Sequence, residues 1–352
     1  MSELQIALLT IGLVAIAAVY VFGWWQQRRY RRKFGSVFKA SHADALYDDS
    51  GATPVDQNTQ PALAEMAAES HVAALSDEPC SQLNTRSDFI IELQLAEPSP
   101  AAVLVGLWQR KFDFHKPVQV CGLALATGEW ERVIAESHTL YRRYRIALQL
   151  VDRSGAISPA KLADFRDLVV GVARHINAQT TVPDTQNAYQ HAVELDEFCA
   201  LVDQMVGVNL VPPGDRLIRA IDIARAAGMH GMMLEADGAF HLLDAHGNSL
   251  FSLINQDTVP FQHHTLDTFA TAGITLLLDV PRVEDPTLRF DQMMRVANDL
   301  ARGLQLSVVD DHRVPLGESG LAHSRAQIAG VEARMRENDI APGSAHALRM
   351  FS

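Results

Sequence analysis

The sequence predicts an α+β protein with an N-terminal transmembrane helix and then tandem split β-α-β domains, each a largely antiparallel sheet with helices on one face. Three observations lead to this prediction. An uncharged apolar run lies near the N-terminus, a strand–helix–strand pattern covers residues 273–311, and a similar pattern occurs earlier in the chain. Hairpin-paired strands that alternate with helical segments favour the split β-α-β arrangement.

The apolar run extends from Leu4 to Phe22 over nineteen residues without a charge. At about 1.5 Å per residue a helix of this length spans roughly 28 Å, enough to cross the hydrocarbon core of a bilayer. A cleaved signal peptide, the alternative, would carry positive charges before the run, whereas only Glu3 precedes it. We therefore expect a single-pass transmembrane anchor over residues 1–27.

Five basic residues follow the run, between Arg28 and Lys33. By the positive-inside rule they place the N-terminus outside and the bulk of the chain in the cytoplasm. The whole chain has a net charge of −12. Nucleic-acid binding depends on Lys and Arg contacts to phosphates, so we expect no nucleic-acid partner.

Residues 28–86 are expected to form the basic juxtamembrane segment and a disordered acidic linker. The linker has little periodicity, and its acidic residues are Asp44, Asp48, Asp49, Asp56, Glu65, Glu69, Asp77 and Glu78. Such a composition cannot bury enough apolar surface to fold alone. A coil of this length has a root-mean-square span of roughly 40 Å, which would keep the folded part close to the membrane.

The strand–helix–strand pattern begins with period-two alternation at residues 274–279. Asp285 and Pro286 predict a helix N-cap and first helical residue. Apolar residues then recur every three or four positions, and Gly303 is expected to end the helix. At an offset of 128 residues, Arg145 to Thr181 repeats the pattern, while Phe89 to Pro100 matches the stretch from Met205 at an offset of about 115.

An ancient tandem duplication explains these matches, with two unrelated strand–helix–strand units as the alternative. We expect a first, degenerate repeat over residues 87–203, a second over residues 204–340, and a C-terminal tail over residues 341–352. Further helices are expected at residues 99–110, 159–176, 188–202, 215–227 and 317–338, and hairpin turns near residues 127–128 and 246–248. The apolar tail is expected to dock on the second domain.

The sequence contains no pattern that predicts catalysis, a cofactor or a metal site. Cys80, Cys121 and Cys199 lack CxxC spacing, so we expect thiols in a reducing compartment and neither a disulfide framework nor a zinc site. Adjacent His263 and His264 make a poor chelate without a third ligand. We expect no enzyme, although an undetected active site on a ferredoxin-like sheet is the alternative from another functional class.

Four stretches in the second repeat carry a resemblance to a known family: LFSLINQ at residues 250–256, TAGITLLLDVP at residues 271–281, the helix at residues 293–304 and VVDDHRVP at residues 308–315. They are similar to the FtsZ-binding domain of the ZipA cell-division family. The resemblance implies an inner-membrane adaptor of the septum and Z ring, with a groove for the C-terminal peptide of FtsZ. The short acidic linker and the additional first repeat depart from the family pattern.

The resemblance implies that the groove lies on the sheet face opposite the helices. Carried over by position, the peptide-binding residues are Met205, Gly207, Leu234, Ala236, Ile254, Gln256, Thr275 and Leu277. Alternation supports this assignment, because residues of the opposite parity supply enough apolar side chains for a helix-covered core. The linker, the tail or the first repeat could instead cover the face, and Gly207 and Gln256 make it shallower or more polar.

The matching positions of the first repeat are Ile90, Glu92, Gln94, Ala147 and Gln149, so its open face is expected to be polar. We therefore expect the second repeat, and not the first, to bind the FtsZ peptide. A membrane-anchored tandem-domain scaffold for another cell-envelope partner is the alternative. The sequence leaves open what the first repeat binds and whether the protein self-associates.

Overall fold

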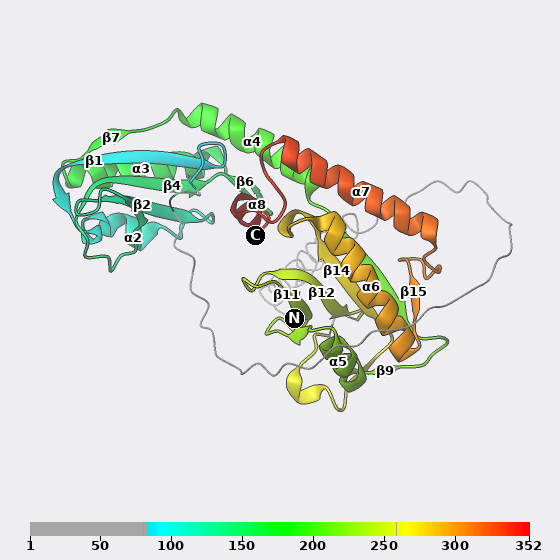
Figure 1. Ribbon diagram of the computed structural model, residues 1–352. Helices are drawn as coiled ribbons and strands as arrows, with labels where there is room; N and C mark the ends of the chain where they lie inside the picture. The colour runs from blue at the N-terminus through cyan, green and yellow to red at the C-terminus, as the bar shows by residue number, and fades with distance from the viewer. Residues whose placement is uncertain (1–79, 81–82, 258) are drawn as a thin grey trace, which may run out of the picture. The chain divides into compact units, whose positions relative to one another are not determined.

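Two antiparallel sheets organise the described part of the chain (Figure 1). The computed structural model describes residue 80, residues 83–257 and residues 259–352. The expected anchor at residues 1–27 and most of the expected linker at residues 28–86 lie outside the described residues. Within the described ranges, no helix is both long enough and apolar enough to cross a membrane.

The first sheet has the strand order β3-β2-β4-β1-β7, and all its neighbours are antiparallel. Its strands are β1 (Asp88–Ser99), β2 (Val118–Ala124), β3 (Trp130–Arg132), β4 (Tyr141–Gln149) and β7 (Gln179–Thr181). A short hairpin of β5 (Val151–Asp152) and β6 (Gly155–Ala156) follows β4.

The helices of this half are η1 (Ala101–Leu104), α2 (Val105–Arg110), α3 (Pro159–His175) and α4 (Thr185–Val202). Helix α3 begins as expected, because Ser158 Oγ accepts a hydrogen bond from the Lys161 N–H at 3.3 Å. Phe165 of α3 meets Phe89 of β1 edge to face, at a centroid distance of 6.3 Å. This packing places α3 on one face of the first sheet.

The second sheet has the order β10-β11-β12-β14-β8-β15 and is also antiparallel throughout. Its strands are β8 (Met205–Val211), β10 (Met233–Leu234), β11 (Phe240–Leu243), β12 (Ser249–Asn255), β14 (Ile274–Asp279) and β15 (Ser307–Val309). The remaining elements are β9 (Ile218–Arg219), α5 (Ala220–Met229), η2 (His263–Thr265), β13 (Ala270–Thr271), η3 (Val280–Arg282), α6 (Pro286–Leu304), α7 (Glu318–Glu337) and α8 (Ala345–Met350).

Helix α6 packs against β8, β12 and β14, and α5 and α7 pack against α6 (Figure 1).

The expected start of α6 is correct at Pro286, but its expected cap is wrong. Asp285 has a left-handed backbone with φ of 50° and makes no side-chain cap. The buried Glu332 of α7 takes that role, accepting hydrogen bonds from Thr287 N–H at 3.3 Å and Thr287 Oγ1 at 2.6 Å. The helix ends at Leu304 and passes through Gly303.

The two sheets agree in the placement of three strands and differ in the rest. Strands β4-β1-β7 match β14-β8-β15 in position and in their order along the chain. The hairpin beside them is reversed, because its earlier strand, β2, neighbours β4 in the first sheet, whereas the later strand, β12, neighbours β14 in the second. The offsets taken from the sequence are also not mutually consistent. They align Glu92 with Gly207 and Gln149 with Leu277, yet Gly207 pairs with Leu277 whereas Gln149 pairs with Asp88. The α+β fold with antiparallel sheets is confirmed, and the duplication stays a prediction.

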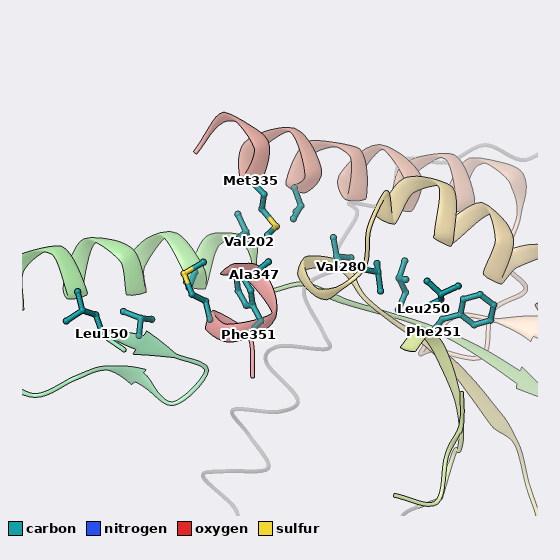
Figure 2. Packing of buried hydrophobic residues seen from close by; sticks show 14 of the residues in the cluster. Leu150, Val202, Leu250, Phe251, Val280, Met335, Ala347 and Phe351 are labelled. Carbon is teal, nitrogen blue, oxygen red and sulfur yellow. The ribbon is translucent and has the colours of Figure 1, made fainter. Parts of the chain in front are cut away.

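The C-terminal tail joins the elements of both sheets, instead of docking on the second alone. Ala347, Met350 and Phe351 are buried, and α8 contacts both η3 and β5 (Figure 2). The Arg349 guanidinium forms an ion pair with Asp88, whose carboxylate is fully buried. Gln149 Nε2 also donates to the Arg349 carbonyl at 2.9 Å. The last turn of the chain therefore contributes directly to the core.

The expectation of three free thiols is wrong. Cys80 and Cys121 form a disulfide across a sequence separation of 41 residues, while Cys199 is a buried free thiol. The absence of CxxC spacing argues against a metal site formed by cysteines close in sequence. It gives no information about cysteines that the fold brings together from distant positions. Here β2, which lies next to the edge strand β3 of the first sheet, holds Cys121 beside Cys80.

Candidate functional site

The second sheet has two chemically different faces, as its alternation predicts. The residues facing the helices are fully or nearly fully buried: Val206, Val208, Leu210, Phe251, Leu253, Ile274, Leu276 and Leu278. Their neighbours of opposite parity on β8 and β14 are mostly half-buried. We call the face formed by these neighbours, opposite the helices, the open face of the second sheet.

Strand register places five of the predicted residues together on this open face. Leu277 pairs with Gly207, Thr275 pairs with both Asn209 and Ile254, and Met205 pairs with Asp279. Directly paired residues project to the same side of a sheet and lie within reach of one another. Met205, Gly207, Ile254, Thr275 and Leu277 therefore share one surface.

The placement of Leu234 and Ala236 differs from the prediction. Leu234 pairs with the buried Phe240 and so belongs to the helix side, while its neighbour Met233 pairs with His241 on the open face. Ala236 lies beyond β10, in the turn that leads to β11. The Asp237-Gly238 dipeptide is a hairpin signal. A hairpin centred on this turn pairs Phe240 with Leu234 and therefore His241 with Met233. The sequence thus contained a signal that places Met233 on the open face.

Gln256 has the predicted parity but lies one residue beyond the end of β12 and is exposed. Its backbone N–H donates to the Gly273 carbonyl at 3.1 Å, so the chain still follows β14 there. Gln256 thus lies at the margin of the open face, next to Ile254.

A continuous row of paired residues crosses five strands of the open face. It consists of Met233 on β10, His241 on β11, Ser252 on β12, Leu277 on β14 and Gly207 on β8. Sequence reasoning missed the middle of this row, because it did not place β11 between β10 and β12. The row is apolar at Met233 and Leu277 and polar between them.

Gly207 has no side chain, so the row has a low point, a recess in the open face, at this position. A Cβ atom at this position would lie 3.3 Å from Leu277 Cδ2 and 3.6 Å from Thr275 Cγ2. The β14 side chains therefore lean toward the glycine from the neighbouring strand. A larger residue here would have to displace Leu277, so the glycine allows that side chain its present position.

Polar networks border the open face. Thr275 Oγ1 donates to Asn209 Oδ1 at 2.7 Å, and Asn209 Nδ2 donates to Asp311 Oδ1 at 3.0 Å. On β11, the His241 ring nitrogens lie 2.7 Å from Ser249 Oγ and 3.0 Å from Asp237 Oδ2. These partners fix the side chains around the apolar positions in place.

Arg153, from the hairpin after β4, closes the end of the open face next to Met205. Its guanidinium donates to Asp279 at 2.7 Å and to Asp203 at 2.9 Å. Burial works against its charge, but the hydrogen bonds and charges of the two carboxylates outweigh burial and raise the pKa of Arg153. The hairpin of the first half is thus bound to the end of the second sheet.

The open face of the first sheet is polar, as predicted. Glu92 on β1 accepts hydrogen bonds from Arg143 at 2.7 Å and Arg145 at 2.8 Å, both on β4. These bonds, that of Arg145 foremost, lower the pKa of Glu92. The Arg145 guanidinium also lies 4.2 Å from the centre of the Trp130 ring. The disulfide at Cys121 occupies the adjacent part of this face.

No metal centre is apparent in the part of the chain that the structure describes. Within it, no three His, Cys, Asp or Glu side chains are grouped closely enough to hold an ion. His263 and His264 are exposed in η2.

Comparisons with known proteins support the resemblance seen in the sequence. Residues 204–327 match the family model of the ZipA C-terminal FtsZ-binding domain. The cell division protein ZipA of Colwellia psychrerythraea is 24% identical over 157 residues, which cover 44% of this chain and 41% of that protein.

Two relatives align over most of their length. The ZipA proteins of Shewanella oneidensis and Shewanella sediminis are each 22% identical to this chain, over 346 and 337 residues. These alignments cover 90% and 89% of this chain, and 96% and 94% of the relatives. The resemblance to the ZipA family is thus confirmed. It agrees with the expectation of a non-enzymatic protein, because the matched domain is described by what it binds.

Proposed function

We propose that this chain is a membrane-anchored adaptor of bacterial cell division that binds the C-terminal peptide of FtsZ on the open face of the second sheet. The observation that carries the proposal is the position of the open face inside the residues that match the FtsZ-binding domain. Apolar side chains on a sheet face without helices provide a docking surface for a peptide.

The contacts of the open face indicate how a peptide would be held. Leu277, Ile254, Met205 and Met233 are apolar side chains on four different strands. They would bury apolar side chains of the peptide, while the Asn209 amide, which donates one N–H to Asp311, has a second N–H beside them. Each such contact is weak, but an anchored protein meets many copies of the peptide along one filament, which raises its apparent affinity.

Membrane tethering is part of the same proposal. It rests on the apolar run at residues 4–22 and on the basic residues that follow it. The orientation follows the positive-inside rule, with the N-terminus in the periplasm of a bacterial inner membrane and the sheets in the cytoplasm, at the division site.

The experiment is a titration of the full chain, held in detergent micelles, with a labelled peptide of the FtsZ C-terminus from the same organism. Leu277→Glu places a charge in the centre of the open face, and Met229→Glu is the matched control, because Met229 is 75% exposed on α5. We expect micromolar-range binding that Leu277→Glu abolishes and Met229→Glu retains. Equal binding by both variants, or none by the folded parent chain, contradicts the proposal and leads to the alternative of a scaffold for another envelope partner.

A further inference from the structure

The turn after α2 exposes a phenylalanine outside the candidate peptide site. Phe112 is 77% exposed, the highest value for a large hydrophobic residue in the described part of the chain. Isolated exposed apolar residues are common on proteins, but an apolar patch with a polar rim indicates an interaction site. The side chains around Phe112 determine whether it is an isolated exposed residue or part of an interaction site.

The turn that exposes Phe112 is fixed firmly in the core. Two residues later, Phe114 is buried and meets Phe165 edge to face at a centroid distance of 5.2 Å. Lys116 is also buried and donates to Ser154 Oγ at 2.9 Å and to the Gly155 carbonyl at 2.6 Å. With Phe114 pointing inward, Phe112 is held outward by the fold.

Phe112 lies near other aromatic and apolar side chains. Lys111 Nζ lies 4.9 Å from the centre of the Phe112 ring and 5.4 Å from that of Trp108, so the three side chains are contiguous. Trp108 Nε1 donates to the Ala101 carbonyl at 2.8 Å, which fixes the indole. Val105 is 53% exposed and lies one helical turn before Trp108. We call Val105, Trp108, Lys111 and Phe112 the aromatic patch.

The charge around the aromatic patch is positive, in contrast to the acidic chain as a whole. Arg110 pairs with Asp113 at 3.1 Å, and Lys161 Nζ donates to the Asp113 carbonyl at 2.7 Å. The turn thus has three basic residues, Arg110, Lys111 and Lys161, near one acidic residue, whose carboxylate pairs with Arg110, whereas the full chain has a net charge of −12. Such a local excess attracts a negatively charged surface that the rest of the molecule would repel.

We propose that the aromatic patch docks on the surface of an anionic lipid bilayer. Tryptophan and phenylalanine suit the boundary between headgroups and acyl chains, and Lys and Arg reach from there to lipid phosphates. Anionic lipids supply the charge that the basic rim requires. The expected anchor at residues 1–27 would keep this surface beside a bilayer. The proposal does not depend on the peptide site.

Fluorescence quenching of Trp108 tests this contact in the full chain. The chain has four tryptophans, and replacing Trp24, Trp25 and Trp130 by Phe leaves Trp108 as the reporter. The protein is reconstituted into vesicles of acyl-brominated phosphatidylcholine, with or without phosphatidylglycerol. Bromine quenches tryptophan only at close range, so quenching reports entry of Trp108 into the bilayer surface even though the anchor holds every molecule to the vesicle.

We expect strong quenching in vesicles that contain phosphatidylglycerol and loss of this quenching at high salt. Phe112→Ser and Lys111→Glu should abolish it, whereas Met229→Ser, at another highly exposed apolar residue, should leave it unchanged. Circular dichroism checks that each variant is folded. Absence of quenching in the parent chain, or equal quenching without anionic lipid, overturns the proposal. Shielding of Trp108 from aqueous iodide without bromine quenching would also overturn it, because a protein would then cover the patch.

Discussion

The open faces of the two sheets differ in chemistry although β4, β1 and β7 of the first sheet occupy the positions of β14, β8 and β15 in the second. On the second sheet, Gly207 and Leu277 are directly paired and leave an apolar side chain beside a low point. On the first, the central pair is Glu92 and Arg145, joined by a hydrogen bond of 2.8 Å. The same arrangement of these three strands thus carries an apolar surface in one half and a closed ionic cluster in the other.

The arrangement of these strands alone therefore does not determine which half offers an apolar surface to a peptide. Function depends on the residues displayed on a fold and not on the fold itself. In the first sheet Glu92, Arg143 and Arg145 satisfy one another, so a peptide would have to compete with those contacts. In the second sheet the apolar side chains gain stability only when something covers them. Substitutions in each half test this difference.

The largest effect is expected at the joint between the two halves, where the C-terminal tail covers one end of the first sheet's open face. Arg349→Leu leaves the fully buried Asp88 carboxylate without its ion-pair partner. Removing one partner of a buried pair costs about 3–5 kcal/mol of unfolding free energy. Denaturant unfolding measures the loss, and Arg325→Leu, which breaks an exposed pair with Asp291, is the control with little expected effect. Similar stability of the two variants would show that the two halves do not depend on this joint.

The next effect concerns the disulfide, which lies on the first sheet. Replacing Cys80 and Cys121 by Ser removes a cross-link over 41 residues. We expect a loss of about 2–4 kcal/mol, observed by the same unfolding measurement. Cys199→Ser is the control that leaves the cross-link intact, and an equal loss there would contradict this assignment.

The disulfide also bears on the proposed orientation, because disulfides are rare on the reducing side of a membrane. Alkylation of thiols in intact cells, before lysis, distinguishes the two cases. Modified Cys80 and Cys121 agree with sheets that lie in the cytoplasm. A disulfide retained in cells contradicts that topology.

A third prediction exchanges the chemistry of the two faces. The double variant Gly207→Glu, Leu277→Arg places on the second sheet the charge pair that Glu92 and Arg145 form on the first. We expect peptide binding to fall at least about tenfold, which corresponds to about 1.4 kcal/mol. Peptide titration measures this change, and circular dichroism checks that the fold is retained. Undiminished binding would show that the central pair does not decide where the peptide docks.

The smallest effect is expected from the pH dependence of the first face. Arg145 and Arg143 lower the pKa of Glu92, so its stabilising contribution is present above the ordinary glutamate pKa and is lost as the pH falls through the lowered value. Glu92→Gln should cost about 1 kcal/mol at neutral pH and less in acid. Unfolding at a series of pH values measures the change, with the exposed Glu136→Gln as the control. A cost that is independent of pH would argue against the ionic cluster.

Much of the second sheet could be predicted from its sequence, because alternation determines face. Val206, Val208 and Leu276 are buried as their parity requires, and Leu277 lies on the opposite side. The middle of the row, which sequence reasoning missed, depends on strand order. His241 belongs to the row because β11 lies between β10 and β12. Periodicity within one segment contains no information about which strand lies beside it.

Long-range partners were equally beyond sequence reasoning. The Glu332 cap of α6 comes from α7, and the Asp88–Arg349 pair joins residues that are 261 positions apart. Local capping rules identified Asp285 because they consider only neighbouring residues. The Cys80–Cys121 bond was missed for the same reason, since it depends on tertiary proximity and not on spacing.

The most direct test of peptide docking on the open face of the second sheet is photo-crosslinking of the full chain with an FtsZ C-terminal peptide that carries a benzophenone among its apolar residues. Mass spectrometry identifies the attached residues. We expect attachment to Met233, Ile254, Leu277 or Met205, and competition by unlabelled peptide. Attachment to the first sheet around Arg143 and Arg145, or to the helices that cover the second sheet, would contradict it.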